Sequence, residues 1–424
     1  MKILFISNVV PNSAGGGSPR RAAIQLKALR EMGQVTLVIP PLDGSPVSDI
    51  EGVTVVERGH ALALVRKWRH DASHSPAKRF VHGLRRLNLA DGRAPREEAT
   101  QFRARLSEDF DLVFAFRLWS VLWWETVFRP TSRSVRIADL DDIESNVFAR
   151  KIRGSTGAWW WRAKLRHQLR WLRRTERRVA TEWDAVCLCS RLDADRFVGI
   201  TGVEPWIVPN AYAFGPTAPE PQTPPCRLMF VGTFGYFPNF EGVLWFVETI
   251  WPKVRAELGE GAELALVGLD PTPAILALNG RDGITVAANV PSVDPYYAAA
   301  NIVIAPLLAG SGTRIKLLEA AAKRRAIVTT TLGCEGLGFV DGVHAEIADD
   351  PADFAARIIA LARDAERRAE MANACREFAE ARFSQETVTE NLKDRIGSTI
   401  RARHVQTATW EGQDETALLQ NARR

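Results

Sequence analysis

Short runs of consecutive apolar residues alternate along the chain with longer segments of helical periodicity. The first run, Lys2–Ser7, is followed by the turn cluster Asn12–Pro19 and then by apolar residues at helical spacing from Arg21 to Met32. A continuous apolar run suits a strand that is buried on both faces, so this order predicts a βαβ unit and a parallel sheet. Further strands of the same sheet are expected at Gln34–Ile39, Val53–Val56, Leu112–Phe116, Val135–Ala138 and Ala185–Cys189.

Prolines divide the chain into two parts. Seven of them crowd the stretch from Pro205 to Pro225, which excludes a helix or a central strand there. A second series of alternating strands and helices follows, so we expect an α/β protein with two Rossmann-like domains facing across a cleft. The expected parts are an N-terminal domain at 1–205, a linker at 206–226, a C-terminal domain at 227–375, a helix at 376–400 that returns to the N-terminal domain, and a disordered tail at 401–424.

Composition and charge narrow the class of protein. With 424 residues, 46% hydrophobic and 25% charged, the chain fits two or three folded domains. The net charge of +5 is unevenly spread, because Lys151–Arg178 holds ten basic residues and one acidic one, a local charge of +9, which leaves 5 − 9 = −4 for the rest. We therefore expect no nucleic-acid partner. The opening residues lack the apolar core of a signal peptide, and no uncharged span of ~18 residues follows, so we expect a cytoplasmic protein.

The cationic segment predicts an amphipathic helix at 159–178. It begins with three tryptophans, its apolar stripe continues through Leu165, Leu169 and Leu172, and arginines occupy the remaining positions. This arrangement is typical of a helix that lies in a bilayer interface, so we expect residues 159–178 to bind an anionic membrane surface at the inner face of the cell membrane. The alternatives are a helix packed on its own domain and a dimer interface.

A loop in the second domain has the features of a phosphate site. A strand ends at Pro306, a small-residue loop containing Gly312 and Thr313 follows, and a helix is expected at Arg314–Lys323. Helix N-termini attract phosphate through unpaired N–H groups and the helix dipole, and Arg314 and Lys316 add positive charge. Glu319, one turn further, could accept hydrogen bonds from a ribose diol. The alternative is a surface ion pair between Lys316 and Glu319.

The segment from Pro306 to Ala322, followed by Gly333-Cys334-Glu335-Gly336, resembles the donor-binding signature of retaining glycosyltransferases of family four, which have the GT-B fold. Other pieces match in order, namely the glycine loop after the first strand, Val208-Pro209-Asn210, Phe230-Val231-Gly232 with Pro238-Asn239, Leu266-Val267-Gly268 and Phe383-Ser384. The resemblance implies an enzyme of the hexosyltransferase type that acts with retention, in cell-surface polysaccharide synthesis. It implies a nucleoside-diphosphate sugar donor, a glycan or polyprenyl-linked acceptor, and neither a cofactor nor a metal.

The resemblance also implies roles for particular residues. Glu319 would bind the donor ribose, and Arg314 and Lys316 would neutralise the diphosphate. Many family members carry a second glutamate at the position of Ser311, so Glu335 is the candidate for the contact with the donor sugar, with a loop acid at a helix cap as the alternative. In the first domain, the loop Gly15-Gly16-Gly17 would lie near the donor phosphates, with a flexible turn as the alternative.

Catalytic candidates in the first domain follow two strands. Asp139 and Asp141 belong to a loop with four acids within six residues, and Arg117 follows the strand that ends at Phe116. Such acids could bind a divalent metal, orient acceptor hydroxyls or stabilise charge at the anomeric carbon, and we favour orientation of the acceptor or sugar. The alternative is an acidic loop that caps the next helix.

Two other functions remain open at this point. One is a catalytically inactive GT-B partner protein, which the serine at position 311 leaves possible. The other is an NAD(P)-dependent oxidoreductase, which would need GxGxxG after the first strand and an acid at the end of the second. The chain has Ser13–Ser18 without that spacing, and Pro40-Pro41 instead of the acid, which disfavours the oxidoreductase.

Overall fold

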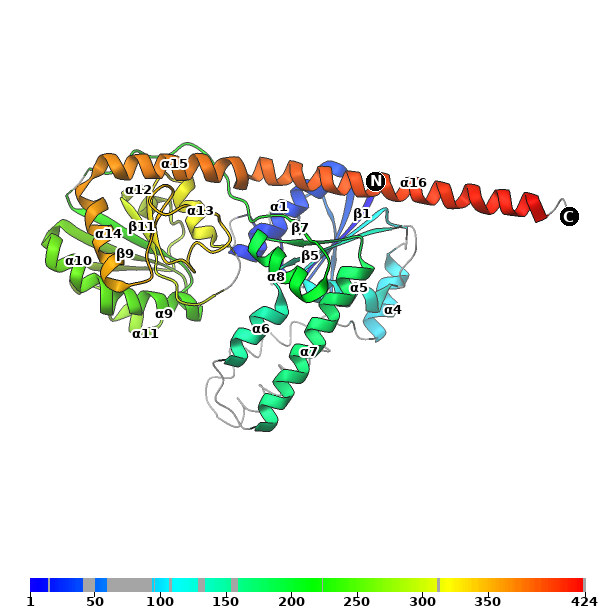
Figure 1. Ribbon diagram of the computed structural model, residues 1–424, viewed down its shortest axis with the longest axis horizontal. Coiled ribbons are helices and arrows are strands. Elements are labelled where there is room, and N and C mark those ends of the chain that lie inside the picture. Colours follow the sequence, from blue (N-terminus) through cyan, green and yellow to red (C-terminus); the bar gives the residue numbers. More distant parts are fainter. Residues whose placement is uncertain are drawn as a thin grey trace. The chain divides into compact units, whose positions relative to one another are not determined.

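A computed structural model describes residues 1–13, 16–40, 50–58, 94, 96–106, 109–128, 134–153, 159–222, 224–310 and 313–421 (Figure 1). The chain divides into two compact units, Met1–Val208 with Thr389–Arg424, and Pro209–Val388. Each unit contains one parallel sheet with helices packed on it, so the predicted α/β class is confirmed.

The sheet of the first unit has the strand order β3-β2-β1-β4-β5-β6-β7, with every pairing parallel. Its strands are β1 (Lys2–Ser7), β2 (Gln34–Ile39), β3 (Thr54–Glu57), β4 (Leu112–Phe116), β5 (Val135–Asp141), β6 (Ala185–Leu188) and β7 (Trp206–Ile207). All residues of β1 after Lys2 are buried, as expected for a central strand covered on both faces.

The described α-helices of the first unit before Val208 are α1 (Gly17–Met32), α4 (Arg96–Arg105), α5 (Leu118–Val127), α6 (Glu144–Arg153), α7 (Trp159–Glu182) and α8 (Arg191–Thr201). Helix α1 begins four residues before the predicted start at Arg21. Pro19 is tolerated there because the first-turn N–H groups have no partner within a helix. Helix α8 is capped at both ends, since Ser190 Oγ accepts a hydrogen bond from Asp193 N and Gly202 ends the helix at φ 77°.

The sheet of the second unit has the order β10-β9-β8-β11-β12-β13, again with parallel pairings. Its strands are β8 (Cys226–Val231), β9 (Ala262–Gly268), β10 (Ile284–Ala288), β11 (Ile302–Ala305), β12 (Ala326–Thr329) and β13 (Glu346–Ile347). Its α-helices are α9 (Phe237–Trp245), α10 (Trp251–Leu258), α11 (Pro273–Leu276), α12 (Asp294–Ala299), α13 (Ile315–Ala322), α14 (Pro351–Arg363) and α15 (Ala365–Phe383).

The helical segment from Phe237 to Leu258 is interrupted. A π-helical turn, Phe246–Ile250, separates α9 from α10. Pro252 lies in the first turn of α10 and has no N–H to donate, so the regular α-helical ladder cannot continue through it.

The proline-rich stretch packs on the second unit, which corrects the expectation of a linker at 206–226. Arg325 Nη2 donates to the carbonyls of Ala218 and Pro219 at 3.1 Å, and Arg368 Nε lies 2.6 Å from Glu220 Oε1. Carbonyls next to prolines find no sheet partner here, and these buried arginines supply donors instead. The boundary between the units falls between Val208 and Pro209.

The C-terminal part also differs from the expectation. Helix α16 (Gln385–Asn421) extends through positions predicted as a disordered tail from 401. Ser384 Oγ accepts from Thr387 N at its start, and no proline follows to end it. From Thr389 onward the helix groups with the first unit, where Lys393 Nζ lies 2.7 Å from Glu31 Oε2.

In each sheet the order of strands reverses once along the chain. The first sheet grows from β1 through β2 to β3 and then continues from β4 on the other side of β1; the second does the same at β8 and β11. Loops at the carboxyl ends of these neighbouring strands diverge, which makes each reversal a topological switch point where open α/β sheets bind ligands.

Candidate functional site

At the switch point of the second unit, a lysine from the helix that follows β11 contacts residues of β8 and of the helix that follows β8. Lys316, the second residue of α13, places Nζ 2.9 Å from Asn239 Oδ1 and 4.0 Å from the ring centroid of Phe230. A Cβ on Gly232 would lie 2.7 Å from Asn239 Nδ2 and 3.0 Å from Lys316 Nζ. Only glycine therefore leaves room for this contact at the end of β8.

The cations at this point lie close to each other. Arg314 is 9% exposed and is the N-cap residue of α13, so the helix begins one residue later than predicted. Burial and the charge of Arg314 lower the pKa of the half-buried Lys316 to about 7. An anion bound beside both side chains would raise that pKa again, because it favours the charged form of the lysine.

Glu319 lies one turn further along α13. It is 8% exposed, and its Oε2 accepts a hydrogen bond of 3.2 Å from the hydroxyl of Tyr297, a fully buried residue of α12. The alternative of a surface ion pair with Lys316 is therefore wrong, since Glu319 is not at the surface. The tyrosine fixes one carboxylate oxygen of Glu319.

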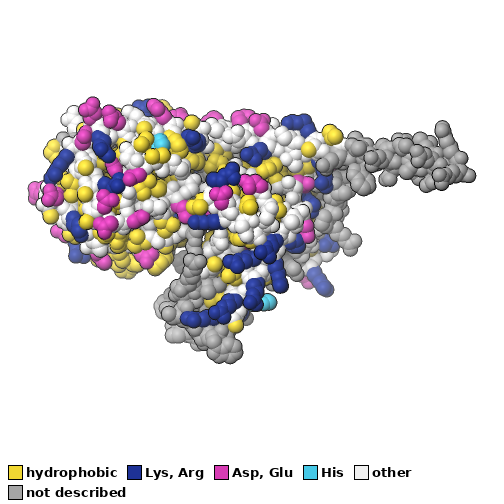
Figure 2. All heavy atoms as spheres, viewed as in Figure 1, with side chains coloured by type: hydrophobic (Ala, Val, Ile, Leu, Met, Phe, Trp, Pro, Cys, Tyr) yellow, Lys and Arg dark blue, Asp and Glu magenta, His cyan; other side chains and the backbone are white. Residues whose placement is uncertain are grey.

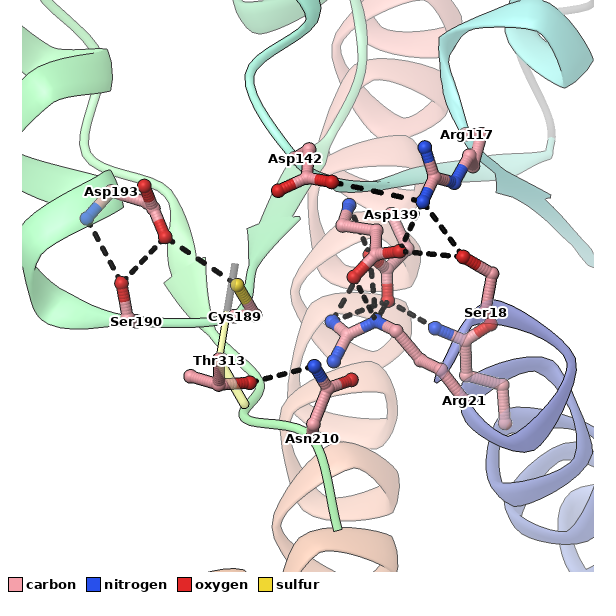
Figure 3. Close-up of polar contacts among 12 residues, drawn as sticks. Ser18, Arg21, Arg117, Asp139, Asp142, Cys189, Ser190, Asp193, Asn210 and Thr313 are labelled. Carbon is pink, nitrogen blue, oxygen red and sulfur yellow. Dashed lines mark hydrogen bonds and ion pairs between the residues drawn. The ribbon is translucent and has the colours of Figure 1, made fainter. Parts of the chain in front are cut away.

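The other candidates of the second unit lie around these residues. Thr313 Oγ1 accepts a hydrogen bond of 2.7 Å from Asn210 Nδ2, and both residues are buried (Figure 3). Glu335 is half-buried in the turn that follows β12, the strand beside β11. The predicted sites Ser311 and Gly312 lie outside the described residues.

At the switch point of the first unit, an arginine joins the loops after β1, β4 and β5. Arg117 Nη2 lies 2.7 Å from Ser18 Oγ (Figure 3). The same nitrogen lies 2.7 Å from Asp141 Oδ2. The sequence predicted Arg117 and Asp141 separately, and the structure brings them into contact. Arg117 has φ 72° and ψ 151°, a region almost restricted to glycine, and such backbone strain is concentrated at functional sites.

Asp139, predicted to orient a substrate, is instead buried beneath this cluster and faces no solvent. Arg21 approaches both of its carboxylate oxygens, at 2.8 and 3.1 Å, and Gln25 donates to one of them. Asp139 Oδ1 also accepts from Asp141 N at 2.9 Å. The carboxylate is therefore used within the protein, because a buried charge requires a paired, hydrogen-bonded partner.

The positive charges of Arg21 and Arg117 offset most of the negative charge of the acidic residues at and after the end of β5. Arg117 also lies 3.8 Å from Asp142 and 3.5 Å from Glu144. Burial and the neighbouring Asp141 raise the pKa of Asp142 to about 7. Within the described residues, no group of three or more His, Cys, Asp or Glu side chains could hold a metal ion.

The glycine loop is described only in part. Gly15 lies outside the described residues, Gly16 is the N-cap of α1 and Gly17 is its first residue. A Cβ on Gly16 would meet nothing within 4 Å, and its φ of −69° is open to any residue. The fold therefore leaves room for a side chain at Gly16, and the position of the loop near the donor phosphates stays a prediction.

Part of the apolar stripe of the cationic helix packs against the protein. In α7, Leu165 and Leu172 are buried, and Leu172 belongs to the core of the first unit. Helix α6 lies beside α7 (Figure 1). This packing accounts for the stripe at Leu165 and Leu172, which are therefore not free to insert into a bilayer. Leu169 is half-buried, and the side chains of Trp159, Trp160 and Trp161 lie outside the described residues. The described part of the chain contains no helix long and apolar enough to span one.

The polar face of α7 remains exposed. Figure 2 shows Lys and Arg side chains gathered along it. Its exposed arginines are Arg162, Arg166, Arg170, Arg173, Arg174 and Arg177. Their charge is available to a partner outside the protein.

Sequence reasoning missed three side chains of these sites. Asn239 was visible only as part of a matching motif, whereas Ser18 and Tyr297 had no signal at all. Tyr297 lies 22 residues from Glu319 on another helix, and Ser18 lies 99 residues from Arg117. Contacts over such separations follow from the fold and cannot be read from local spacing.

Comparison with known proteins finds a family match within the second unit. Residues 225–364 match the protein family described as "Glycosyl transferases group 1". The chain is 26% identical over 176 residues to the "Uncharacterized 44.6 kDa protein in cps region" of Klebsiella pneumoniae, a match that covers 39% of this chain. The chain thus spans 45% of the length of this curated relative.

Solved structures are similar over nearly the whole chain. Sucrose-phosphate synthase from Thermosynechococcus elongatus has a TM-score of 0.67 at 14% identity, covering 95% of this chain and all of its own. WaaG, a glycosyltransferase involved in lipopolysaccharide biosynthesis, has a TM-score of 0.61 at 14% identity over 93% of this chain and 99% of its own. Anabaena HepE, solved in complex with UDP, has a TM-score of 0.62 at 13% identity over 94% of this chain and all of its own. These likenesses show the GT-B fold.

Proposed function

Starting from a glycosyl transferases group 1 domain at residues 225–364, we propose that this protein transfers a sugar from a nucleoside-diphosphate sugar to a glycan or lipid-linked acceptor. The proposal includes retention at the anomeric carbon and a role in cell-surface polysaccharide synthesis. The observation that carries it is the arrangement of Arg314, Lys316 and Glu319 at the start of α13, beside the switch point of the second sheet.

The donor would bind along α13. The N-terminus of the helix, Arg314 and Lys316 would neutralise a diphosphate, and Glu319, held by Tyr297, would accept hydrogen bonds from the ribose hydroxyls. A nucleoside-diphosphate donor is supported by the structural similarity to HepE, which was solved in complex with UDP. Two cations and a helix N-terminus can stabilise a departing diphosphate, so the proposed chemistry needs no metal.

The reaction would proceed on one face of the sugar. The bond from the anomeric carbon to the donor phosphate breaks, and a bond from the same carbon to the acceptor oxygen forms on the same side. The acceptor proton passes to the departing phosphate oxygen, so no protein nucleophile is required. Detection of a covalent sugar–protein adduct would contradict this mechanism.

The acceptor side would use the cluster at the first switch point. Arg117 and Asp141 are partly exposed and fixed against each other, so they can orient polar groups of an acceptor or of the donor sugar. Asp139 would act through them: it contacts Asp141 N, and its carbonyl accepts from Arg117 N at 2.6 Å. Glu335 remains our candidate for a contact with the donor sugar.

We further propose that the protein works in the cytoplasm, at the inner face of the cell membrane. The support is the exposed row of arginines on α7, since each basic residue near an anionic leaflet contributes about 1 kcal/mol. Binding would rest on charge, because Leu165 and Leu172 of the apolar stripe are buried in the protein.

A panel of nucleotide sugars tests the proposed activity. The purified protein is incubated with each donor, and release of the nucleoside diphosphate is measured with and without acceptor extracts, with Glu319→Ala as the control. Turnover that is absent in the variant supports a transferase. Nucleotide binding without turnover of any donor would favour the inactive partner protein instead.

A further inference from the structure

The loop after β8 contains an asparagine whose two amide atoms have different partners. Asn239, the third residue of α9, is 8% exposed. Its Nδ2 donates to Thr233 O at 2.9 Å, and its Oδ1 accepts from Lys316 Nζ at 2.9 Å. A carbonyl only accepts and an ammonium only donates, so the reversed amide would lose both hydrogen bonds. The two partners therefore fix the orientation of this side chain.

Lys316 needs such a partner because its cation is carried on a flexible four-carbon stem. The second close contact of Nζ is the face of Phe230, with 4.0 Å to the ring centroid. Amide and ring are both uncharged, and within the described residues Lys316 forms no ion pair. The ammonium is thus held in one place by groups that do not neutralise it.

The surrounding backbone makes room for this arrangement. Gly232 lies directly beside Asn239 Nδ2 and Lys316 Nζ. A Cβ on Gly268 would lie only 1.7 Å from the carbonyl oxygen of Gly232, so the ends of β8 and β9 also approach closely. The lysine and asparagine consequently lie against bare backbone at the switch point of the sheet.

We propose that Asn239 is a positioning residue of the donor site, which holds Lys316 Nζ at the end of β8 and leaves its charge for the donor diphosphate. This inference rests on the proposed function. It predicts that the residue at position 239 must accept a hydrogen bond without carrying charge. Leucine would not hold the lysine, and aspartate would hold it but neutralise it.

The pH dependence of nucleotide binding is a readout that a merely structural role would not change. The charged groups that act on Lys316 are Arg314, which lowers its pKa, and Glu319, which raises it. The groups that face Nζ from β8 and α9, Phe230 and Asn239, are uncharged. Since the pKa of Lys316 is about 7, affinity for a diphosphate should fall as the pH rises through that value.

A double-mutant cycle tests the inference. The affinities of UDP and GDP are measured by calorimetry for the native protein, Asn239→Leu, Lys316→Met and the double variant, each with its melting temperature. We expect Asn239→Leu to weaken binding about tenfold in the native background, as for a lost hydrogen bond to a charged group. In the Lys316→Met background the same change should have an effect below about twofold.

Two further variants complete the test. Asn239→Asp, which is nearly isosteric, should weaken binding and move the fall in affinity to higher pH, because a carboxylate stabilises the lysine cation. Asn279→Leu is the matched control. Asn279 Oδ1 also accepts a hydrogen bond from backbone in this unit, from Val286 N, but Asn279 is not among the partners of Lys316. It should leave affinity and pH profile unchanged.

The outcomes separate the two proposals. Equal weakening by Asn239→Leu with and without Lys316 would mean that the asparagine acts through the fold, and would overturn the inference. So would unchanged affinity in Asn239→Leu, while the proposed function would stand. A native protein that binds neither UDP nor GDP would overturn both.

Discussion

Arg117 Nη2 lies 2.7 Å from Asp141 Oδ2, and both residues have positive φ, 72° and 61°. They follow β4 and end β5, which are neighbours in the first sheet. Left-handed backbone at a residue other than glycine costs roughly 1–3 kcal/mol. The ion pair between them, together with the buried Asp139 beneath, offsets this cost, so the fold maintains a strained polar pair at its switch point.

Comparison of Arg117→Gly with Arg117→Ala would isolate the backbone strain. Both variants lose the same guanidinium contacts, but glycine adopts the observed φ and ψ freely and alanine does not. We expect the glycine variant to be more stable by about 1–2 kcal/mol in urea unfolding, and both to lose transfer activity. Equal stability of the two variants would show that the backbone relaxes at this position.

Glu319 should distinguish ribose from deoxyribose. If its carboxylate accepts hydrogen bonds from the ribose hydroxyls, the native protein should bind UDP or GDP about tenfold more tightly than the 2′-deoxy form. Glu319→Gln should lose most of this preference, because an amide offers a weaker acceptor. Calorimetry with the paired nucleotides measures both values.

Tyr297→Phe is the variant to compare with Glu319→Gln in these measurements of nucleotide affinity. It removes only the hydroxyl that contacts Glu319 Oε2 and should weaken binding less than Glu319→Gln does. A variant Glu319→Gln that still prefers the ribose form as strongly as the native protein would exclude this carboxylate as the ribose contact.

Because Glu176 is buried, we predict that the stability of the first unit depends on pH. Burial raises the pKa of this fully buried carboxyl to about 7 in spite of a hydrogen bond from Ser145 N. The folded state therefore keeps a proton that the unfolded state releases from about pH 4.5. The contribution of Glu176 to the free energy of unfolding is therefore complete below about pH 4.5 and is lost as the pH rises to about 7.

Glu176→Gln removes this titration. We expect the variant to gain stability over the native protein as the pH rises from 5 to 7.5, by up to about 3 kcal/mol, measured by urea unfolding. Glu182→Gln, which changes an exposed acid of the same helix, should follow the native profile. A difference between Glu176→Gln and the native protein that does not vary with pH would contradict the assignment.

The basic face of α7 should bind anionic vesicles by charge alone. Sedimentation with phosphatidylglycerol vesicles should recover the protein at low salt, and phosphatidylcholine vesicles should not. Replacing Arg166, Arg170, Arg173 and Arg174 by glutamine should abolish recovery, and 0.5 M salt should do the same. The control variant has the same net charge. It carries glutamine at four surface arginines of the second unit, Arg227, Arg281, Arg363 and Arg367. Binding that persists in high salt would indicate apolar insertion instead.

The amino-acid sequence by itself determined the architecture and the location of the donor loop. Continuous apolar runs such as Lys2–Ser7 and Leu112–Phe116 favour strands buried on both faces, and their alternation with helical segments indicates a parallel sheet, whose strands end at a common edge. The loop after β11 was therefore placed at the carboxyl edge of its sheet, and so was the acidic segment near the end of β5, although the strand itself runs on through Asp139 to Asp141. Local pattern is sufficient for these features because the length of an apolar run and the periodicity of the segment after it are both properties of neighbouring residues.

Only the tertiary structure decided which side chains meet. Asn239 and Lys316 are 77 residues apart, and Arg21 and Asp139 are 118 apart, so neither contact has a local signal. The stripe at Leu165 and Leu172 shows the same limit, since an amphipathic pattern reveals that one face is apolar but not what covers it. Packing of distant segments determines those contacts, and with them which charges remain for a ligand.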